Sequence, residues 1–375
     1  MNFIIFASIF LTVFALFSVY ISKRLIKKLD FKPKIKSYLN YFLIFNYFGT
    51  ILYMLSRYQI SVPNSLYFIF SLSMGIIFLL FLTTLFYEFF HLFVNIAPLN
   101  PQRRQFFKKS LDIGSVSMAI AISANATYKA KEITLEKVEV LIKNLKKEYK
   151  VVQLSDLHIG GLIEKNFIFD VVQKVNTLKP DLIVITGDLI DVDLKYTKEA
   201  IKELSNLKSK YGAYFVVGNH EYFHGIEEIM EYINLIGIKV LENENIYIGE
   251  ENQGFNLAGV YDLFGYRYGK FQPNIKQALS NIKSSPTVLL AHQPRYIYEV
   301  EDRSIDLILS GHTHGGQIFP FNYLVSLVQP YVKGLHLHNN TTQIYVNKGT
   351  GFWGPPMRLG ANAEITQLVL KGEIG

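Results

Sequence analysis

Cysteine is absent from the 375 residues of the chain. Without thiols the protein can have no disulfide, no Cys-ligated zinc or iron–sulfur cluster and no thiol nucleophile. This absence indicates no compartment, because a cysteine-free chain suits both reducing and oxidising environments. Charged residues are also scarce, at 18% against about 25% in typical soluble proteins, whereas hydrophobic residues make up 50%. This balance excludes a disordered chain and argues against an all-soluble enzyme.

The hydrophobic residues are concentrated in the first third of the chain. Three apolar stretches there approach the roughly 20 residues that a helix needs to cross a bilayer. They lie at about 1–22, 38–56 and 66–87. A fourth segment, 111–128, contains Asp112 and many small residues, and it is either a packed span or an amphipathic or buried linker. We predict a membrane region over 1–128 with three to four transmembrane helices, then a linker and first strand over 129–147 and a second domain over 148–375.

Lysine and arginine are unevenly distributed along the chain. Residues 1–128 have a net charge of +9, so the remainder carries −2 of the total +7. The basic residues cluster after the first and third stretches, and only Arg57 lies between the second and third. By the positive-inside rule, those two loops face the cytoplasm and the N-terminus lies outside. The second domain is then extracytoplasmic if 111–128 crosses the membrane, as we expect, and cytoplasmic if it does not.

This distribution also predicts the partners of the chain. The basic loops offer contacts to anionic membrane lipids, whereas the nearly neutral second domain has no basic surplus for nucleic acid. The run Arg103–Lys108 (RRQFFK) resembles a twin-arginine export signal, and the alternative is a basic cluster beside the membrane. We expect a multi-pass protein of the cell membrane, with no nucleic acid as partner.

The second domain has the pattern of an α/β fold. Short runs rich in Val, Ile and Leu alternate with polar stretches of helical periodicity. The predicted strands are 138–142, 150–154, 182–186, 213–217, 287–291 and 306–310, and the predicted helices are 166–178, 197–208, 225–235 and 275–282. This alternation indicates an α/β architecture with a buried sheet.

Five of the predicted strands are followed directly by polar motifs. The motifs are Ser155–His158 (SDLH), Thr186–Asp188 (TGD), Val217–Glu221 (VGNHE), Ala291–Gln293 (AHQ) and Gly311–Gln317 (GHTHGGQ). Open α/β sheets place their sites at the carboxyl ends of strands, and glycine lets the chain turn sharply there. One such motif alone is usually a turn or a cap, but five in order indicate a single site.

These motifs contain the ligand types of a metal centre. Apart from His220 they supply two Asp, four His and one Asn. Imidazole and carboxylate together suit Mn, Fe or Zn. Seven donors exceed the three or four that one zinc takes, and they fit two ions about 3.5–4 Å apart that share one carboxylate.

The motifs, in this order, resemble those of the calcineurin-like metallophosphoesterases over about residues 148–372. The longer runs Gly311–Pro320 (GHTHGGQIFP) and Asn347–Gly360 (NKGTGFWGPPMRLG) resemble a membrane-associated bacterial subgroup. The resemblance implies a four-layered α/β/β/α sandwich and two divalent metal ions, Mn, Fe or Zn. It implies a first ion bound by Asp156, His158 and His314, a second bound by Asn219, His292 and His312, and Asp188 as the bridge between them.

The resemblance also makes His220 the catalytic histidine. It would protonate the leaving group or stabilise its charge after attack by hydroxide, which two cations make available near neutral pH. Asp191 is a candidate for the shell around the ligands, and Arg358 is either a phosphate clamp or part of a surface salt bridge. His224 is a candidate lining residue. His336 and His338 lack an acidic or glycine-turn motif, so we expect a solvated strand face there.

We therefore expect a membrane-anchored phosphoesterase that hydrolyses a phosphodiester or phosphomonoester by metal-activated hydroxide, with a lipid or cell-envelope substrate. One alternative is a pyrophosphatase of the UDP-diacylglucosamine type, which would require a cytoplasmic catalytic domain. Another is a non-catalytic membrane scaffold. A scaffold would be expected to have lost ligands, and every ligand position of the pattern is filled here.

Overall fold

The computed structural model describes residues 3–58, 62–300 and 305–373. Met1 and Asn2 of the predicted first span, and the last two residues of the predicted second domain, lie outside the described residues. The chain divides into two compact units. The helical unit extends to Tyr128 and also includes Gly354–Met357, and the α/β unit comprises Lys129–Trp353 and the residues from Arg358 onward.

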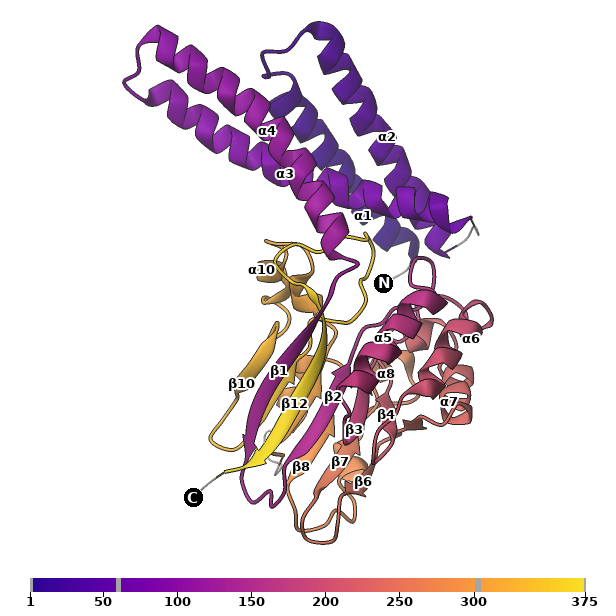
Figure 1. Ribbon diagram of the computed structural model, residues 1–375. Coiled ribbons are helices and arrows are strands. Elements are labelled where there is room, and N and C mark those ends of the chain that lie inside the picture. Colours follow the sequence, from indigo (N-terminus) through magenta and orange to yellow (C-terminus); the bar gives the residue numbers. More distant parts are fainter. Residues whose placement is uncertain (1–2, 59–61, 301–304, 374–375) are drawn as a thin grey trace. The chain divides into compact units, whose positions relative to one another are not determined.

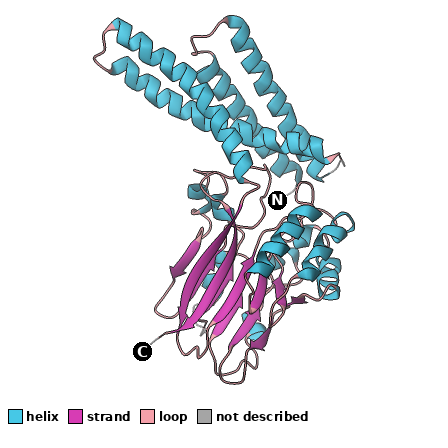
Figure 2. Cartoon of the chain, viewed as in Figure 1, coloured by secondary structure: helices cyan, strands magenta, loops and turns pink. Residues whose placement is uncertain are grey.

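The helical unit is built from long helices (Figures 1 and 2). They are α1 (Phe3–Ile21), continued by the π-helical turn Ser22–Ile26, α2 (Pro33–Tyr58), α3 (Asn64–Ile96) and α4 (Pro101–Lys129). In the described part of the chain, three helical segments are long and apolar enough to cross a membrane, namely Ile4–Ile26, Pro33–Ser56 and Asn64–Ile96. The predicted fourth segment lies within α4, which is a continuous helix but is not one of these three.

The α/β unit contains two sheets, which are six-stranded over the described residues. The first has the order β1 (Ile133–Ile142), β12 (Ala363–Gly372), β2 (Tyr149–Leu154), β3 (Leu182–Thr186), β4 (Ala213–Val216) and β5 (Lys239–Val240). The second has the order β10 (Gly334–Leu337), β11 (Gln343–Val346), β9 (Leu307–Ser310), β8 (Thr287–Leu290), β7 (Phe255–Gly259) and β6 (Glu244–Ile248). β2, β3 and β4 are parallel neighbours in the first sheet, as β7, β8 and β9 are in the second.

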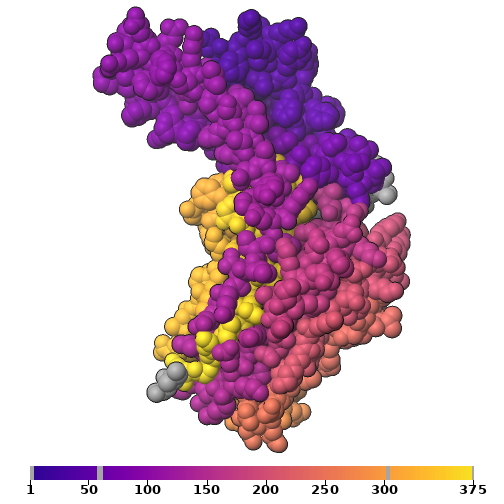
Figure 3. Space-filling view, viewed as in Figure 1, coloured from indigo at the N-terminus to yellow at the C-terminus, as the bar shows by residue number. Residues whose placement is uncertain are grey.

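The two ends of the α/β unit pair with each other. β12 lies between β1 and β2, parallel to the first and antiparallel to the second. Figure 3 shows β1 and β12, purple and yellow, side by side on the surface. One edge of the first sheet is therefore built from residues that lie more than 200 positions apart in the sequence.

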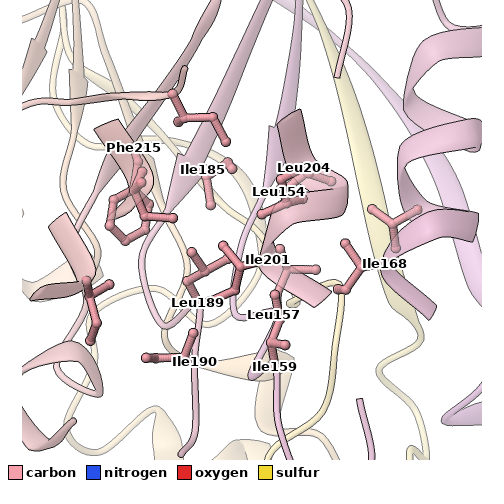
Figure 4. Packing of buried hydrophobic residues seen from close by; sticks show 14 of the residues in the cluster. Leu154, Leu157, Ile159, Ile168, Ile185, Leu189, Ile190, Ile201, Leu204 and Phe215 are labelled. Carbon is pink, nitrogen blue, oxygen red and sulfur yellow. The ribbon is translucent and has the colours of Figure 1, made fainter. Parts of the chain in front are cut away.

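Three apolar layers hold the α/β unit together. The middle layer lies between the sheets and includes Val151 and Val184 of the first sheet and Leu257 and Leu309 of the second. The outer face of the first sheet packs on α5 (Lys165–Thr177), α6 (Leu194–Lys202) and α7 (Ile226–Leu235). Figure 4 shows part of this cluster, with Leu154, Ile185 and Phe215 of neighbouring strands beside Ile201 of α6.

The outer face of the second sheet is covered more thinly. Its cluster includes Ala278 of α9 (Ile275–Ala278) and residues of the 3-10 helix Pro294–Glu299. The arrangement is the four-layered α/β/β/α sandwich, so the predicted fold class is confirmed. The helix predicted over 275–282 is shorter than expected. No prediction was made for β5, β6, β7, β11 and β12, or for α8 (Phe264–Tyr268) and α10 (Asn322–Val325), whereas the strand expected at His336 is β10.

Candidate metal centre

The five predicted motifs meet at one edge of the sandwich. Three of them follow β2, β3 and β4 of the first sheet, and two follow β8 and β9 of the second. Because the strands in each set are parallel, their carboxyl ends lie at the same edge of the sheet. Residues from two sheets therefore share one site.

Asp156, His158 and His314 form the first ligand group, with one potential ligand atom of each within 4.8 Å of the others. The Nε2 atoms of His158 and His314 are 3.0 Å apart, and His314 Nε2 is 3.5 Å from Asp156 Oδ1. All three side chains are buried. Two imidazole nitrogens and a carboxylate oxygen that point at one position have the chemistry of a divalent cation site.

Asp188, His292 and His312 form the second group. His292 Nε2 lies 3.2 Å from Asp188 Oδ2 and 3.2 Å from His312 Nδ1. The other ring nitrogen of His292, Nδ1, lies 2.7 Å from the carbonyl oxygen of Thr186, which can only accept a hydrogen bond. Nδ1 therefore carries a proton, so Nε2 is the ring nitrogen that His292 can offer to a cation in the second group.

Asn219 adds an unsatisfied oxygen to the site. Its Oδ1 atom is buried and has no hydrogen-bond partner among the described residues. A buried carbonyl oxygen without a donor costs free energy unless something absent from the protein chain satisfies it. The orphaned oxygen fits a metal ligand, which is the role that the resemblance implied for Asn219.

Asp188 connects the two groups. Its Oδ2 atom is 3.2 Å from His292 Nε2 in the second group and 4.0 Å from His158 Nε2 in the first. Its Oδ1 atom accepts the backbone N–H of His220 at 2.9 Å. Gly218 leaves room for this carboxylate, because a Cβ atom at that position would lie 2.2 Å from Asp188 Oδ1. Asp188 is thus placed to bridge two ions.

His220 lies beside this bridge and is held by Asp191. A carboxylate oxygen of Asp191 is 2.6 Å from His220 Nδ1 and 3.0 Å from His158 Nδ1. An ionised carboxylate only accepts, so both rings have their Nδ1–H on Asp191 and their Nε2 atoms facing the centre. His220 Nε2 is 3.8 Å from Asp188 Oδ2, and its side chain retains some exposure.

The backbone of the site is held in an uncommon conformation. Five candidate ligands have φ angles between 50° and 70°, in the left-handed region that favours glycine. They are Asp156, His158, Asp188, His312 and His314. Each such residue costs of order 1 kcal/mol, and strain of this kind persists only where the surrounding structure imposes it.

Glu221 imposes the turn at Asp188, and the sequence analysis did not single it out. One carboxylate oxygen of Glu221 accepts the N–H groups of Gly218 and Asp188 at 2.6 and 3.1 Å. The other accepts those of Leu189 and Ile190 at 2.7 and 3.3 Å. The side chain is fully buried. In the sequence, Glu221 is marked only by its place as the last residue of the VGNHE motif.

The electrostatics differ between the ligands of the site. Burial raises the pKa of Asp156, whereas for His292 burial is outweighed by the charge of Asp188, which holds its pKa well above the usual value. Burial lowers the pKa of His312 to about 3, and burial together with the charge of His158 holds the pKa of His314 well below its usual value. Burial opposes ionisation of Asp188, but the charges of His292 and His220 outweigh it and place its pKa well below the usual range. Neutral imidazoles and an ionised bridging carboxylate are the forms that bind cations.

Arg358 is placed differently from both expectations. It is fully buried, and its guanidinium donates to the carbonyl oxygens of Gly351, Lys348, Ala361 and Gly349. It therefore ties the C-terminal loop together beneath His314 and forms neither an exposed phosphate clamp nor a surface salt bridge in this structure. Burial lowers the pKa of Arg358 to about 10, which leaves it charged at neutral pH.

The remaining histidines lie outside the ligand groups. His224 has its Nδ1 atom 3.9 Å from a carboxylate oxygen of Asp193. His336 lies on the partly exposed strand β10, and His338 follows it, where its Nδ1 is 3.0 Å from the Tyr331 hydroxyl. Neither of this pair is in a metal-ligand group among the described residues.

The chain is similar to known proteins. Residues 149–316, which include every predicted metal ligand, match the family described as calcineurin-like phosphoesterase. An uncharacterized metallophosphoesterase of Helicobacter pylori J99 is 40% identical over 84% of this chain and 84% of its own length. One from Campylobacter jejuni is 37% identical over the full length of both. A transmembrane protein with metallophosphoesterase domain from Bos taurus is 40% identical over 59% of this chain and 53% of its own.

Proposed function

The chain belongs to the calcineurin-like metallophosphoesterases, a family of phosphoester hydrolases, and from this premise we propose that it is a membrane-anchored enzyme with two divalent ions. It hydrolyses a phosphodiester or a phosphomonoester, and the membrane anchor favours a lipid or cell-envelope substrate. Two ligand groups converge on one oxygen of Asp188, and this convergence carries the proposal.

Seven residues would bind the two ions. Asp156, His158 and His314 would hold one ion, Asn219, His292 and His312 would hold the other, and Asp188 would bridge them. When bound, Mn, Fe or Zn ions would neutralise phosphate oxygens and supply hydroxide near neutral pH.

His220 acts on the leaving group. Asp191 accepts from Nδ1 and stabilises the imidazolium form, so that Nε2 can give its proton to the departing alkoxide. The carboxylate of Asp191 also orients His158, so that it couples the proton donor to the first ligand group. His220 is a catalytic residue in this scheme, and Asp191 is a positioning residue.

Hydrolysis of soluble probes by the full-length protein in detergent tests this function. Bis-p-nitrophenyl phosphate and p-nitrophenyl phosphate serve as diester and monoester, with Mn²⁺ added after chelation. We expect Asp188→Ala to lose bound metal and activity, and His220→Ala to keep the metal but lose activity. His336→Ala is the matched control, because His336 lies outside the ligand groups. Full activity in either of the first two variants would refute the mechanism.

The catalytic unit lies outside the cytoplasm in this proposal, because α4 is taken as a fourth crossing. Asp112, the residue that weakens this segment as a span, is buried and accepts hydrogen bonds from the Tyr87 hydroxyl and the Asp30 backbone at 2.9 and 2.7 Å. Its carboxylate is thus shielded from lipid. A reporter that is active only outside the membrane, fused after residue 130, should be active. An inactive reporter would place the catalytic unit in the cytoplasm and revive the pyrophosphatase alternative.

A further inference from the structure

The segment that follows the ligand His314 in the α/β unit carries a series of exposed apolar side chains. Six of its side chains are exposed, and Leu327 is 79% exposed. We call these residues the α10 patch: Phe319, Phe321, Tyr323, Leu324, Leu327 and Val328. Single apolar residues on a surface need no explanation, but a cluster of this kind marks an interaction site.

The α10 patch is held in place at both ends. At its start, the Gln317 side chain donates to the Trp353 carbonyl oxygen at 2.7 Å and accepts the Trp353 N–H at 2.9 Å. At its end, buried Gln329 accepts the N–H of Arg295 at 3.1 Å, and Thr313 donates to the Val332 carbonyl oxygen at 2.6 Å. These bonds keep the apolar side chains exposed on a fixed segment.

The segment that carries the α10 patch has charged residues of one sign. From Ile318 to His338 the sequence contains no Asp or Glu, and Lys333 in this run is exposed. Arg295, bonded to the end of the patch, is exposed as well. An aromatic and aliphatic surface with cationic residues at its border suits the interface of a bilayer that contains anionic lipids.

We propose that the α10 patch docks on the surface of a lipid bilayer. We choose a bilayer as the partner because the described part of the same chain contains three helical segments that are long and apolar enough to cross one. Figure 1 shows α10 at the end of the sheets opposite the C-terminus. β12 runs antiparallel to β2 towards that C-terminus, so β2 and its ligands Asp156 and His158 end on the side of α10. Docking would bring lipid phosphate to the side of the sandwich on which the metal centre lies.

Trp353 provides a local reporter of this contact. It is the single tryptophan of the sequence, it is partly exposed, and its backbone is bonded to Gln317 at the start of the patch. The full-length protein would be reconstituted in vesicles of phosphatidylcholine and phosphatidylglycerol, with and without bromine on the phosphatidylcholine acyl chains. We expect brominated lipid to quench the emission of Trp353, and Leu327→Glu to abolish that quenching.

Leu235→Glu is the matched control. Leu235 ends α7 and is also 79% exposed, so the substitution introduces the same charge at equal exposure away from the patch. It should leave the quenching unchanged, and both variants should hydrolyse the soluble diester at the wild-type rate. Docking is refuted if wild-type emission is not quenched, if Leu327→Glu is quenched as strongly as wild type, or if both variants lose quenching alike. The readout is spectroscopic, so it stands or falls independently of the proposed activity.

Discussion

The helical unit and the α/β unit both bury carboxylates, but they surround them with different partners. In the helical unit, Asp112 accepts hydrogen bonds from a tyrosine hydroxyl and a backbone N–H. In the α/β unit, Asp156 and Asp188 face the ring nitrogens of histidines, several of which present lone pairs to the same position. Asp156 and Asp188 also accept backbone N–H groups, from His312 and His220. A carboxylate that meets only donors stabilises a fold, whereas one that in addition faces several ring nitrogens has the surroundings of a metal ligand.

The two units also differ in their backbone φ angles. Among the described residues of the helical unit, no residue other than glycine has a positive φ angle. In the α/β unit, five candidate ligands have one. Burial of a charged group therefore does not distinguish the two units, but unsatisfied acceptors together with backbone strain do. This combination identifies a functional site more specifically than burial does.

Glu221→Gln should produce the largest effect and would test whether the strain at Asp188 is imposed by its neighbours. The new amide NH₂ would face two of the four backbone N–H groups that the carboxylate now accepts. We expect unfolding free energy to fall by about 4 kcal/mol, because each buried donor left without an acceptor costs about 1–3 kcal/mol. Chemical denaturation of the purified protein, with metal content measured in parallel, checks this.

Glu88→Gln in the helical unit is the comparison for that variant. Glu88 pairs with Arg24 and Lys28 at 2.9 Å, and all three side chains are partly exposed. Such pairs contribute at most about 1 kcal/mol, so we expect a small change in stability and none in metal content. Equal losses of unfolding free energy in Glu221→Gln and Glu88→Gln would show that the buried carboxylate of Glu221 stabilises the protein no more than a partly exposed ion pair does.

The sequence was sufficient to predict the site because each motif directly follows a buried, strongly apolar strand. β3 (LIVIT) is predicted to the residue, and the edge at which parallel strands end brings distant motifs such as those at Asp156 and His314 together. The contacts of Arg358 could not be predicted in this way. They depend on which loop carbonyls converge on it, and spacing along the chain carries no such information.

The unpredicted strands have a physical reason as well. β6 is only partly buried and β5 has two residues, so their apolar patterns are weak. β12 is buried and long, but it pairs with β1 and β2 from the opposite end of the unit. Pairing over such a separation is decided by the tertiary structure, and local sequence does not specify it.

Asp262→Asn tests a buried carboxylate of the α/β unit that shares features with both Asp112 and the metal-ligand candidates. Oδ1 accepts from Phe264 N–H and the Gln293 side chain at 2.7 and 2.9 Å, whereas Oδ2 has no hydrogen-bond partner among the described residues. Burial raises the pKa of Asp262 to about 6 from 3.8. As the pH rises, Asp262 therefore loses its proton at a lower pH in the unfolded chain than in the folded one. The stability of the wild-type protein falls as the pH rises from about 4 to about 6.

Asparagine mimics the neutral carboxyl group and removes this pH dependence. Between pH 4 and pH 7 the stability of Asp262→Asn should rise relative to wild type by about 3 kcal/mol, since each pKa unit corresponds to about 1.4 kcal/mol. Thermal unfolding in the presence of chelator, across this pH range, measures the difference. A constant difference would mean that Asp262 is ionised throughout and belongs with the satisfied carboxylates.

Tyr87→Phe should have a smaller effect than Glu221→Gln or Asp262→Asn and would test whether the helical unit only anchors the enzyme. The variant removes the hydroxyl that donates to Asp112 and leaves that buried carboxylate with the Asp30 N–H. A hydrogen bond to a charged group contributes about 1.5–3 kcal/mol, so we expect a loss near the lower end, seen as a lower unfolding temperature in detergent. Tyr47→Phe is the matched control, because among the described residues its hydroxyl makes only a long contact of 3.4 Å to the Leu11 carbonyl oxygen. Both variants should hydrolyse the soluble diester at the wild-type rate. A tenfold loss in Tyr87→Phe alone, with metal content retained, would mean that the satisfied carboxylate of the helical unit also contributes to catalysis, and the distinction between the two units would fail.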